Sequence, residues 1–108
     1  MTYDEGKLIN EIIRAAYPFA QLYRVNVGTV KTASGRRFST GVPKGYPDLS
    51  GYRRIDGRAV FIECKLPYNH VSEEQATFIE AALQCGAIAG VCYSAEEAIL
   101  LVTGDIAG

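Results

Sequence analysis

Hydrophobic residues near the start of the chain recur at the spacing of one helix face. They are Leu8, Ile9, Ile12, Ile13 and Ala16. Intervals of three and four residues place such side chains along one side of an α-helix. Thr2 and Asp4 are candidate N-caps, and Pro18 ends the pattern. The pattern therefore predicts an amphipathic helix over residues 4–17, with the length of a helix that covers a sheet.

The segment after this helix changes from a strand-like to an irregular pattern. Residues 21–27 are rich in β-branched and aromatic side chains and predict a strand that ends at Gly28. Residues 28–47 contain several glycines and prolines and four basic side chains, with little periodicity. They predict a long loop, and loops of this length in small domains commonly bind a ligand or are disordered. We therefore expect this segment to contribute to binding.

Two further strand-like runs, residues 48–55 and 58–65, flank the dipeptide Asp56-Gly57. This dipeptide is favoured in two-residue type I′ hairpin turns. The sequence therefore predicts an antiparallel hairpin in which Ile55 faces Arg58.

Capping signals mark two helices in the second half of the chain. Ser72 and Gln75 have the spacing of a capping box and open a helix that Gly86 stops. Ser94 and Glu97 repeat the signature at the start of a final helix.

Residues 87–93 form a short apolar run between these helices and predict a strand. The order strand, helix, strand over residues 58–93 is a βαβ unit, which requires a parallel strand pair. We therefore expect an α/β fold with a mixed β-sheet flanked by helices. Residues 1–108 form a single domain in this interpretation.

Composition excludes several classes of protein. The chain is 48% hydrophobic and 21% charged, as in ordinary globular domains. The longest stretch without a charge, residues 81–95, is too short to cross a bilayer. The first residues do not resemble a secretory signal, so a cytoplasmic location is expected. Cys64, Cys85 and Cys92 form no metal-binding or redox pair and are expected to be buried free thiols. A solvated loop position is favoured for His70 over a Cys-His nucleophile pair.

The charges are unevenly placed along the chain. The 11 basic and 12 acidic residues give a net charge of −1. Residues 24–65, however, hold nine bases and three acids, or +6, and the rest of the chain sums to −7. A basic segment in an otherwise acidic chain can bind phosphates. Scattered solvated bases would give the same count, so charge alone leaves both interpretations open.

The predicted hairpin gathers two acids and a lysine. A turn at Asp56-Gly57 places Asp48 opposite Lys65, with Glu63 as the diagonal neighbour of Asp48. Side chains alternate across a strand, so Glu63 and Lys65 share this face while Cys64 points into the core. Carboxylates and a main-chain carbonyl are ligands that Mg²⁺ prefers. An ordinary surface salt bridge of Lys65 with either acid is the alternative.

These residues resemble a nuclease signature. Pro47-Asp48, fourteen residues and then Glu63-Cys64-Lys65 look like the PD-(D/E)xK motif, and further segments resemble successive blocks of the VRR-NUC nuclease family. These segments are Glu5-Gly6-Lys7-Leu8-Ile9-Asn10, Tyr23-Arg24-Val25-Asn26-Val27-Gly28, Lys44-Gly45-Tyr46-Pro47-Asp48-Leu49, Ser72-Glu73-Glu74-Gln75 and Gly86-Ala87-Ile88-Ala89-Gly90-Val91. The resemblance is to compact stand-alone members, often found in bacteriophages. It implies a restriction-endonuclease-like core and Mg²⁺- or Mn²⁺-dependent DNA cleavage, often by homodimers acting on branched DNA such as Holliday junctions.

The resemblance also assigns roles to individual residues. Asp48, Glu63 and the main-chain carbonyl of Cys64 would bind the metal, and Lys65 would act on the attacking water or on the phosphate charge. Glu5 is the preferred acid of the first helix and would belong to the metal site as well, with Glu11 as its competitor.

Two positions qualify the family likeness. Gln75 matches a family glutamine that would support Lys65, and its capping role is equally good. Tyr93 stands where the family usually has arginine, which puts in doubt any phosphate contact made by that arginine but not the metal chemistry.

The basic segment completes the hypothesis. The candidate DNA-contacting residues are Arg24, Asn26, Lys31, Arg36, Arg37 and Lys44. Contacts of such side chains to the phosphate backbone position DNA without reading its sequence. We therefore expect a shape-selective endonuclease acting on DNA, with a homodimer as its form. The alternatives are a non-catalytic nucleic-acid-binding or assembly module with the same fold, and a small scaffold whose basic loop binds a protein.

Overall fold

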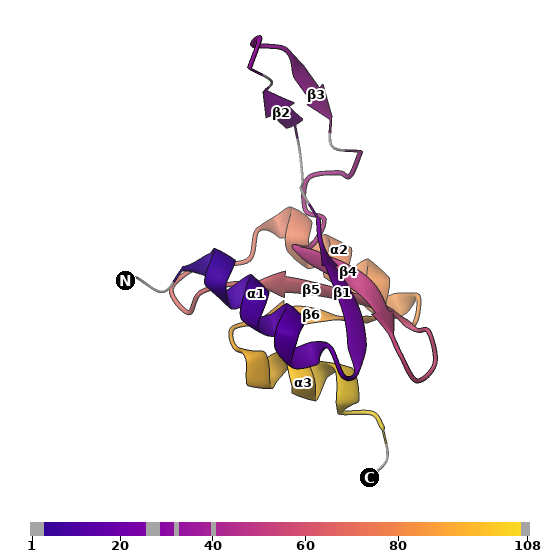
Figure 1. The fold of residues 1–108 in the computed structure, drawn as a ribbon. Coiled ribbons are helices and arrows are strands. Elements are labelled where there is room, and N and C mark those ends of the chain that lie inside the picture. Colours follow the sequence, from indigo (N-terminus) through magenta and orange to yellow (C-terminus); the bar gives the residue numbers. More distant parts are fainter. Residues whose placement is uncertain (1–3, 26–28, 32, 40, 107–108) are drawn as a thin grey trace.

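The chain folds into a four-stranded mixed sheet with helices on both faces, and a two-stranded hairpin stands apart from it (Figure 1). This computed structural model describes residues 4–25, 29–31, 33–39 and 41–106. The elements are α1 (Glu5–Ala16), β1 (Ala20–Arg24), β2 (Thr29–Lys31), β3 (Arg37–Ser39), β4 (Leu49–Arg53), β5 (Ala59–Cys64), α2 (Glu73–Gln84), β6 (Ile88–Cys92) and α3 (Ala95–Thr103). The predicted α/β architecture is confirmed.

The strand order in the main sheet is β1-β4-β5-β6. The β1/β4 and β4/β5 pairs are antiparallel, whereas β5 and β6 are parallel and joined through α2. This is the predicted βαβ unit. Helices α1 and α3 pack together on one face, where the hydrophobic core lies. Leu8, Ile12, Ile62 and Val102 are fully buried in that core.

Local capping explains where the helices begin. Asp4 accepts a hydrogen bond from the backbone N–H of Lys7 at 2.9 Å, so it is the N-cap of α1. Ser94 accepts from the N–H of Glu97 at 3.2 Å and caps α3. The Glu97 carboxylate reaches one residue beyond the expected capping box and accepts from the N–H of Tyr93 at 2.7 Å.

Helix α2 covers only part of the other face. None of its residues is fully buried, and it packs against β5 and β6. Phe78 forms edge-to-face contacts with Phe61 of β5 and with Tyr46, with ring centroids 5.2 and 5.0 Å apart. These contacts show that Phe61 faces α2, whereas its neighbours Val60 and Ile62 face the core.

The long loop expected over residues 28–47 contains a hairpin, so that prediction was wrong for part of the segment. β2 and β3 pair antiparallel, with Val30 opposite Phe38. Gly35 in the connecting turn has φ 87°, a left-handed conformation that glycine adopts without strain. Each strand has three residues, which is too short to produce a periodic pattern in the sequence.

The register between β4 and β5 also differs from the prediction. Leu49 pairs with Ile62, and Arg53 donates its N–H to the carbonyl of Arg58, so residues 54–57 form a four-residue connection. A type I′ turn needs positive φ at both central residues, and of this pair only Gly57 has it, with φ 73°. The strands are therefore offset by two residues from the predicted pairing. Because side chains alternate, an offset of two keeps every residue on its predicted face.

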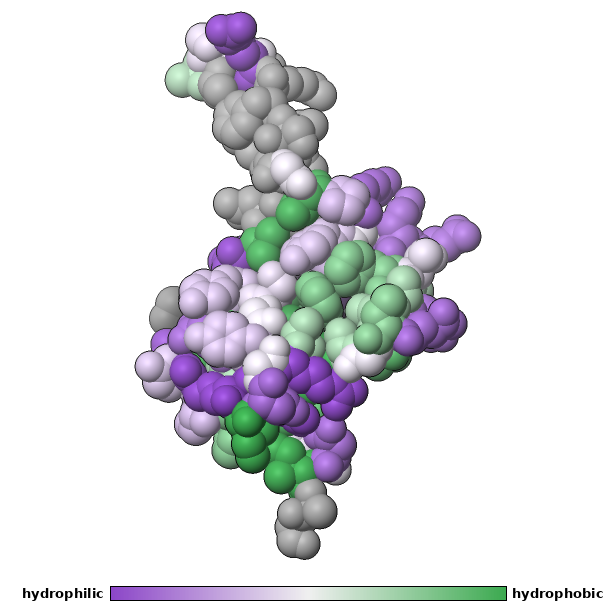
Figure 2. Space-filling model, turned by 90° about the vertical axis from the view of Figure 1, so that its right-hand side faces the viewer, coloured by the Kyte–Doolittle hydropathy of each residue, from purple (hydrophilic) through white to green (hydrophobic). Residues whose placement is uncertain are grey.

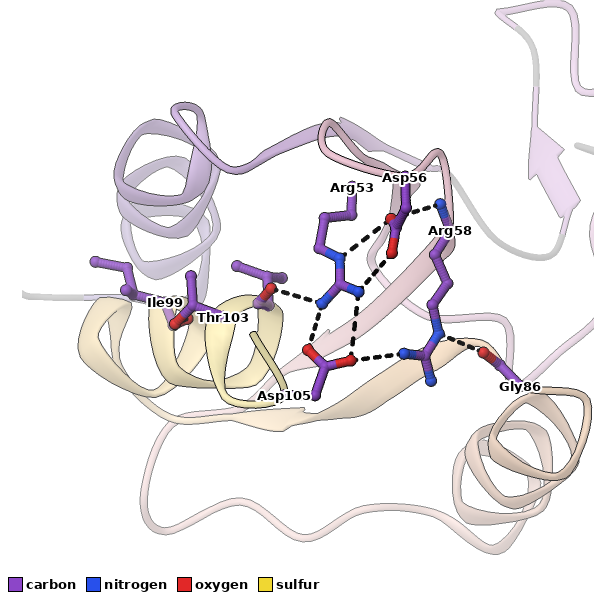
Figure 3. A network of polar contacts seen from close by, with 8 residues as sticks. Arg53, Asp56, Arg58, Gly86, Ile99, Thr103 and Asp105 are labelled. Atoms are coloured by element: carbon purple, nitrogen blue, oxygen red, sulfur yellow. Dashed lines mark hydrogen bonds and ion pairs between the residues drawn. The ribbon is translucent and has the colours of Figure 1, made fainter. Parts of the chain in front are cut away.

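The Asp56 side chain is held by ion pairs instead. Figure 3 shows the Arg53 guanidinium between the carboxylates of Asp56 and Asp105, and it also donates to the carbonyl of Val102 at 3.1 Å. Arg58 donates to Asp105 at 2.8 Å. These bonds attach the β4–β5 connection to the end of α3. Two bases of the predicted basic segment are thus engaged in structural ion pairs.

Two of the three cysteine thiols are buried. Cys64 and Cys92 are buried as expected, and burial raises the pKa of Cys92 to about 12. Cys85 is exposed, because it lies just beyond the end of α2, so the expectation of a buried thiol was wrong at this position.

Within the described ranges, no helix has the length and apolar character needed to span a membrane.

Candidate active site

The candidate acids Asp48 and Glu63 face each other on neighbouring strands. The observed register pairs Leu49 with Ile62, and its continuation by one residue places Asp48 directly opposite Glu63. Leu49 and Ile62 are fully buried in the core, so alternation places both acids on the α2 face. Directly opposed residues have Cβ atoms roughly 4.5–5.5 Å apart. The acids are therefore closer than the predicted diagonal arrangement.

A main-chain group orients Asp48. The N–H of Cys64 donates to Oδ2 of Asp48 at 2.9 Å. The Cys64 thiol itself lies in the hydrophobic core, in agreement with its predicted direction. Only main-chain groups of Cys64 are therefore available to the site.

Glu63 is a buried acid with an unpaired oxygen. Its exposed fraction is 2%, and Oε2 has no hydrogen-bond partner. Burial, followed by the hydrogen bond and the charge of Asp48, raises the pKa of Glu63. A buried oxygen without a partner is costly, so such a group in a native protein calls for a proton or a cation.

The donor set fits a hard divalent cation that keeps several waters. Two carboxylates and a carbonyl oxygen are typical Mg²⁺ ligands, and Mg²⁺ is commonly held by one or two carboxylates with water in the other positions. No group of three or more His, Cys, Asp and Glu residues suited to a metal ion occurs among the residues that the structure describes. Asp48, Glu63 and the Cys64 carbonyl would therefore supply only part of the ligands of such an ion, and water would have to supply the rest.

Lys65 follows these residues along the chain. It is half-buried, and its N–H donates to the carbonyl of Cys92 at 3.1 Å, which continues the parallel pairing of β5 with β6. Alternation places its side chain on the same face as Glu63, and its charge opposes the other influences on the pKa of Glu63. The predicted grouping of two acids and a lysine on one face is thus present, and the role of each residue stays a prediction.

The two candidate helix acids have different surroundings. Glu5 is half-buried in the first turn of α1, and its charge contributes to the raised pKa values of Glu63 and Cys64. Glu11 is exposed further along the helix. Of these two acids, Glu5 is therefore the one whose charge acts on Glu63.

Gln75 forms the predicted capping box. Its Oε1 accepts from the N–H of Ser72 at 2.8 Å, and its own N–H donates to Oγ of Ser72 at 3.1 Å. The capping role is therefore present, and support of Lys65 stays a prediction. His70 is exposed in the preceding loop, as expected.

Comparison with known families identifies this arrangement. A family model described as the VRR-NUC domain matches residues 4–96. The chain belongs to the VRR-NUC family. The match begins at the N-cap of α1 and ends within α3, and it contains all of the candidate site residues. Membership makes this a nuclease domain, whose substrates are nucleic acids. No curated protein matches the chain.

The candidate DNA-contacting residues of this VRR-NUC domain lie on and around the β2–β3 hairpin. Arg24 and Lys44 are exposed on either side of it, and Arg36 is exposed in its turn. Lys31 and Arg37 belong to β2 and β3, and Asn26 lies outside the described residues. Figure 1 shows the hairpin extending away from the sheet. Lys44 lies 3.8 Å from Glu74, an exposed pair of little energetic weight.

Two tyrosines of this face were not among the predicted site residues. Tyr23 pairs with Ser50, and Tyr52 lies two residues further along β4, so both share the face of Asp48. The alternation of buried Leu22 with Tyr23 was the available signal.

An apolar groove lies beside α2, and neither candidate acid lines it. It has a volume of about 490 Å³, and most of its lining residues are small or aromatic. They are Arg58, Ala59, Phe61, Phe78, Ala81, Ala82, Cys85, Gly86 and Ala87. Figure 2 shows that hydrophobic side chains gather in the middle of one face, with hydrophilic side chains around them.

Proposed function

We propose that this domain is a metal-dependent endonuclease that hydrolyses DNA phosphodiester bonds with Mg²⁺ or Mn²⁺. The observation that carries the proposal is the buried, unpaired Oε2 of Glu63 directly across the strand pair from Asp48. Two carboxylates in this position repel each other unless a proton or a cation lies between them. A divalent cation satisfies both, and it suits the family's activity.

The residues around this position have complementary tasks. When bound, the ion would lower the pKa of a water molecule and neutralise phosphate charge. Asp48 is pre-oriented by the Cys64 N–H, so little reorganisation is needed when it binds the ion. Lys65 supplies a fixed positive charge on the same face, suited to the attacking water or the phosphate. Glu5 adds a further negative charge near the site and is proposed to assist the metal ligands.

Structure-selective cutting by a homodimer is part of the same proposal. The segment from residue 24 to residue 47 has five basic and no acidic residues, which suits contact with phosphates rather than with base edges. Two copies of such a domain would present two sites to the opposing strands of a junction or flap. A non-catalytic DNA-binding or assembly module is the alternative from another class.

Cleavage assays separate these possibilities. Supercoiled plasmid, four-way-junction, flap and linear duplex DNA are incubated with the protein in Mg²⁺, Mn²⁺ or EDTA. The enzyme cuts branched DNA in the presence of a metal, and Asp48→Ala and Lys65→Ala stop cutting while DNA binding persists. Undiminished cutting by these variants would reject the site. Retarded DNA without any cutting would support the binding module. Light scattering at the working concentration tests the dimer, and a monomeric mass would contradict it.

A further inference from the structure

Among the described residues, helix α2 covers only part of the sheet face that carries the acids. Helix α2 packs on β5 and β6, whereas the other two strands of the sheet, β1 and β4, present Gln21, Tyr23, Ser50 and Tyr52 on this face. Tyr23 is 57% exposed and Tyr52 is 43% exposed. Large aromatic side chains are thus exposed in the same layer as the candidate active site.

Tyr23 lies close to the acids. It pairs with Ser50, and Asp48 is the next residue of β4 on the same face. Tyr23 is therefore the diagonal neighbour of Asp48, roughly 7–8 Å away between Cα atoms and within reach of an aromatic side chain. Nucleotides adjoining a phosphate held at Asp48 and Glu63 would lie at this distance.

Charge selects the direction in which a bound strand continues. Helix α2, on one side of the acids, contains three acidic residues and no basic ones. On the other side, β1 ends in Arg24 and continues into the basic segment, residues 24–47, which has no acid. A polyanion bound at the acids is repelled by α2 and attracted toward β1. It would therefore cross the uncovered face that Tyr23 occupies.

We propose that Tyr23 is a stacking platform for an unpaired base next to the scissile phosphate, and that Tyr52 extends this platform along β4. The inference rests on the proposed nuclease function and narrows its substrate class to DNA with unpaired nucleotides beside the cut, such as flaps and open junctions. Aromatic side chains bind every base through its π-face without sequence preference. In a fully stacked duplex these base faces are covered, so an intact duplex does not use the platform.

The absence of tryptophan from the sequence gives a direct test. Tyr23→Trp introduces the single tryptophan of the chain, which can be excited selectively over the tyrosines. Its emission is measured in EDTA during titration with a short single-stranded oligonucleotide, a flap substrate or a blunt duplex. Stacking on unpaired bases quenches the emission with the first two ligands and not with the duplex. Tyr17→Trp is the matched control, because Tyr17 is equally exposed, at 57%, but lies at the end of α1 over Arg54. Its emission stays unchanged.

Kinetics provide a second readout. Tyr23→Ala weakens binding of the flap substrate about five- to 150-fold and raises KM with kcat nearly unchanged, whereas Tyr23→Phe keeps the wild-type values. An unquenched Tyr23→Trp protein, equal quenching by the blunt duplex, or a wild-type KM in Tyr23→Ala would each overturn the platform. A change in molecular mass in Tyr23→Ala would also overturn it, since the face would then bind a second copy of the chain. If the wild-type protein cuts no substrate, the proposed function fails, and the quenching experiment still decides about Tyr23.

Discussion

Asp48 and Glu63 lie directly opposite each other across the β4–β5 pair, and one of the four carboxylate oxygens, Oε2 of Glu63, is buried without a hydrogen-bond partner. The Cys64 N–H donates to Asp48 from the backbone of the same strand that carries Glu63. The fold thus places two acids together where water cannot solvate both of them. This arrangement disfavours the state in which both carboxylates are charged and no proton or cation lies between them.

We expect Glu63→Gln to stabilise the metal-free protein and to abolish its response to metal. The amide has the same shape, removes the buried acid and can donate to Asp48, so the free energy of unfolding in EDTA should rise by about 1 kcal/mol. The melting temperature should increase by about 5 °C. Mn²⁺ should raise the melting temperature of the wild-type protein and leave that of Glu63→Gln unchanged. If Mn²⁺ still raised the melting temperature of the variant, Glu63 would not be a metal ligand.

Substitutions in α1 test which acid assists the site. Glu5→Gln should reduce kcat at least about tenfold, because its charge lies near Glu63. Glu11→Gln is the matched control on the same helix, where the side chain is exposed, and its kcat should equal that of the wild-type protein. Melting temperatures of both variants exclude a general loss of folding. A larger effect of Glu11→Gln than of Glu5→Gln would reverse the assignment.

The parts of the fold that depend on local chemistry were predictable. Asp4, Ser72 and Ser94 cap the three helices as their sequence signatures indicate. The βαβ unit followed from the order of these signals. Each cap depends on groups within four residues of one another, so the sequence pattern contains the necessary information.

The register of β4 against β5 was not predictable in this way. The connection depends on Arg53, whose carboxylate partner Asp105 lies 52 residues away along the chain. No local sequence pattern shows that the Arg53 side chain contacts residues at the end of α3. Nor does one show that Asp56 forms an ion pair with Arg53 and lacks the positive φ of a type I′ turn. The predicted residues still share one face, because the observed register of β4 against β5 differs from the predicted one by two residues. An offset of two leaves every side chain on its predicted face. The unpaired oxygen of Glu63 depends on burial, which the sequence alone does not show.

The ion pairs around Arg53 predict acid sensitivity. The hydrogen bond from Arg53 lowers the pKa of Asp56 to about 2, with a further contribution from the Arg58 backbone, and Arg53 also lowers the pKa of Asp105. An acid with a lowered pKa in the folded state stabilises it above the ordinary pKa, and this contribution is lost as pH falls toward the folded value. The free energy of unfolding should therefore decrease between about pH 4 and pH 2.

Urea unfolding at several pH values measures this decrease. Asp56→Asn and Asp105→Asn should each be less stable than the wild-type protein at neutral pH and should lose less stability on acidification. Glu96→Gln, an exposed position on α3, is the control and should follow the wild-type curve. An acid dependence in Asp56→Asn as steep as that of the wild-type protein would show that these ion pairs do not cause it.

The close approach of β1 to β4 at Gly51 leaves no room for an added methyl group. A Cβ at this position would lie 1.8 Å from the backbone carbonyl oxygen of Gln21, so β1 would have to move away from β4. Because that oxygen belongs to the backbone, the strain cannot be relieved by a side-chain rotation. Gly51→Ala should lower the free energy of unfolding by about 1–3 kcal/mol. Displacing β1 also moves Tyr23 relative to Asp48, so the variant should bind flap DNA more weakly even under conditions where it is folded. Ser50→Ala, the neighbouring control on the exposed face, should leave the stability almost unchanged, and equal losses in the two variants would contradict a close approach of the strands at Gly51.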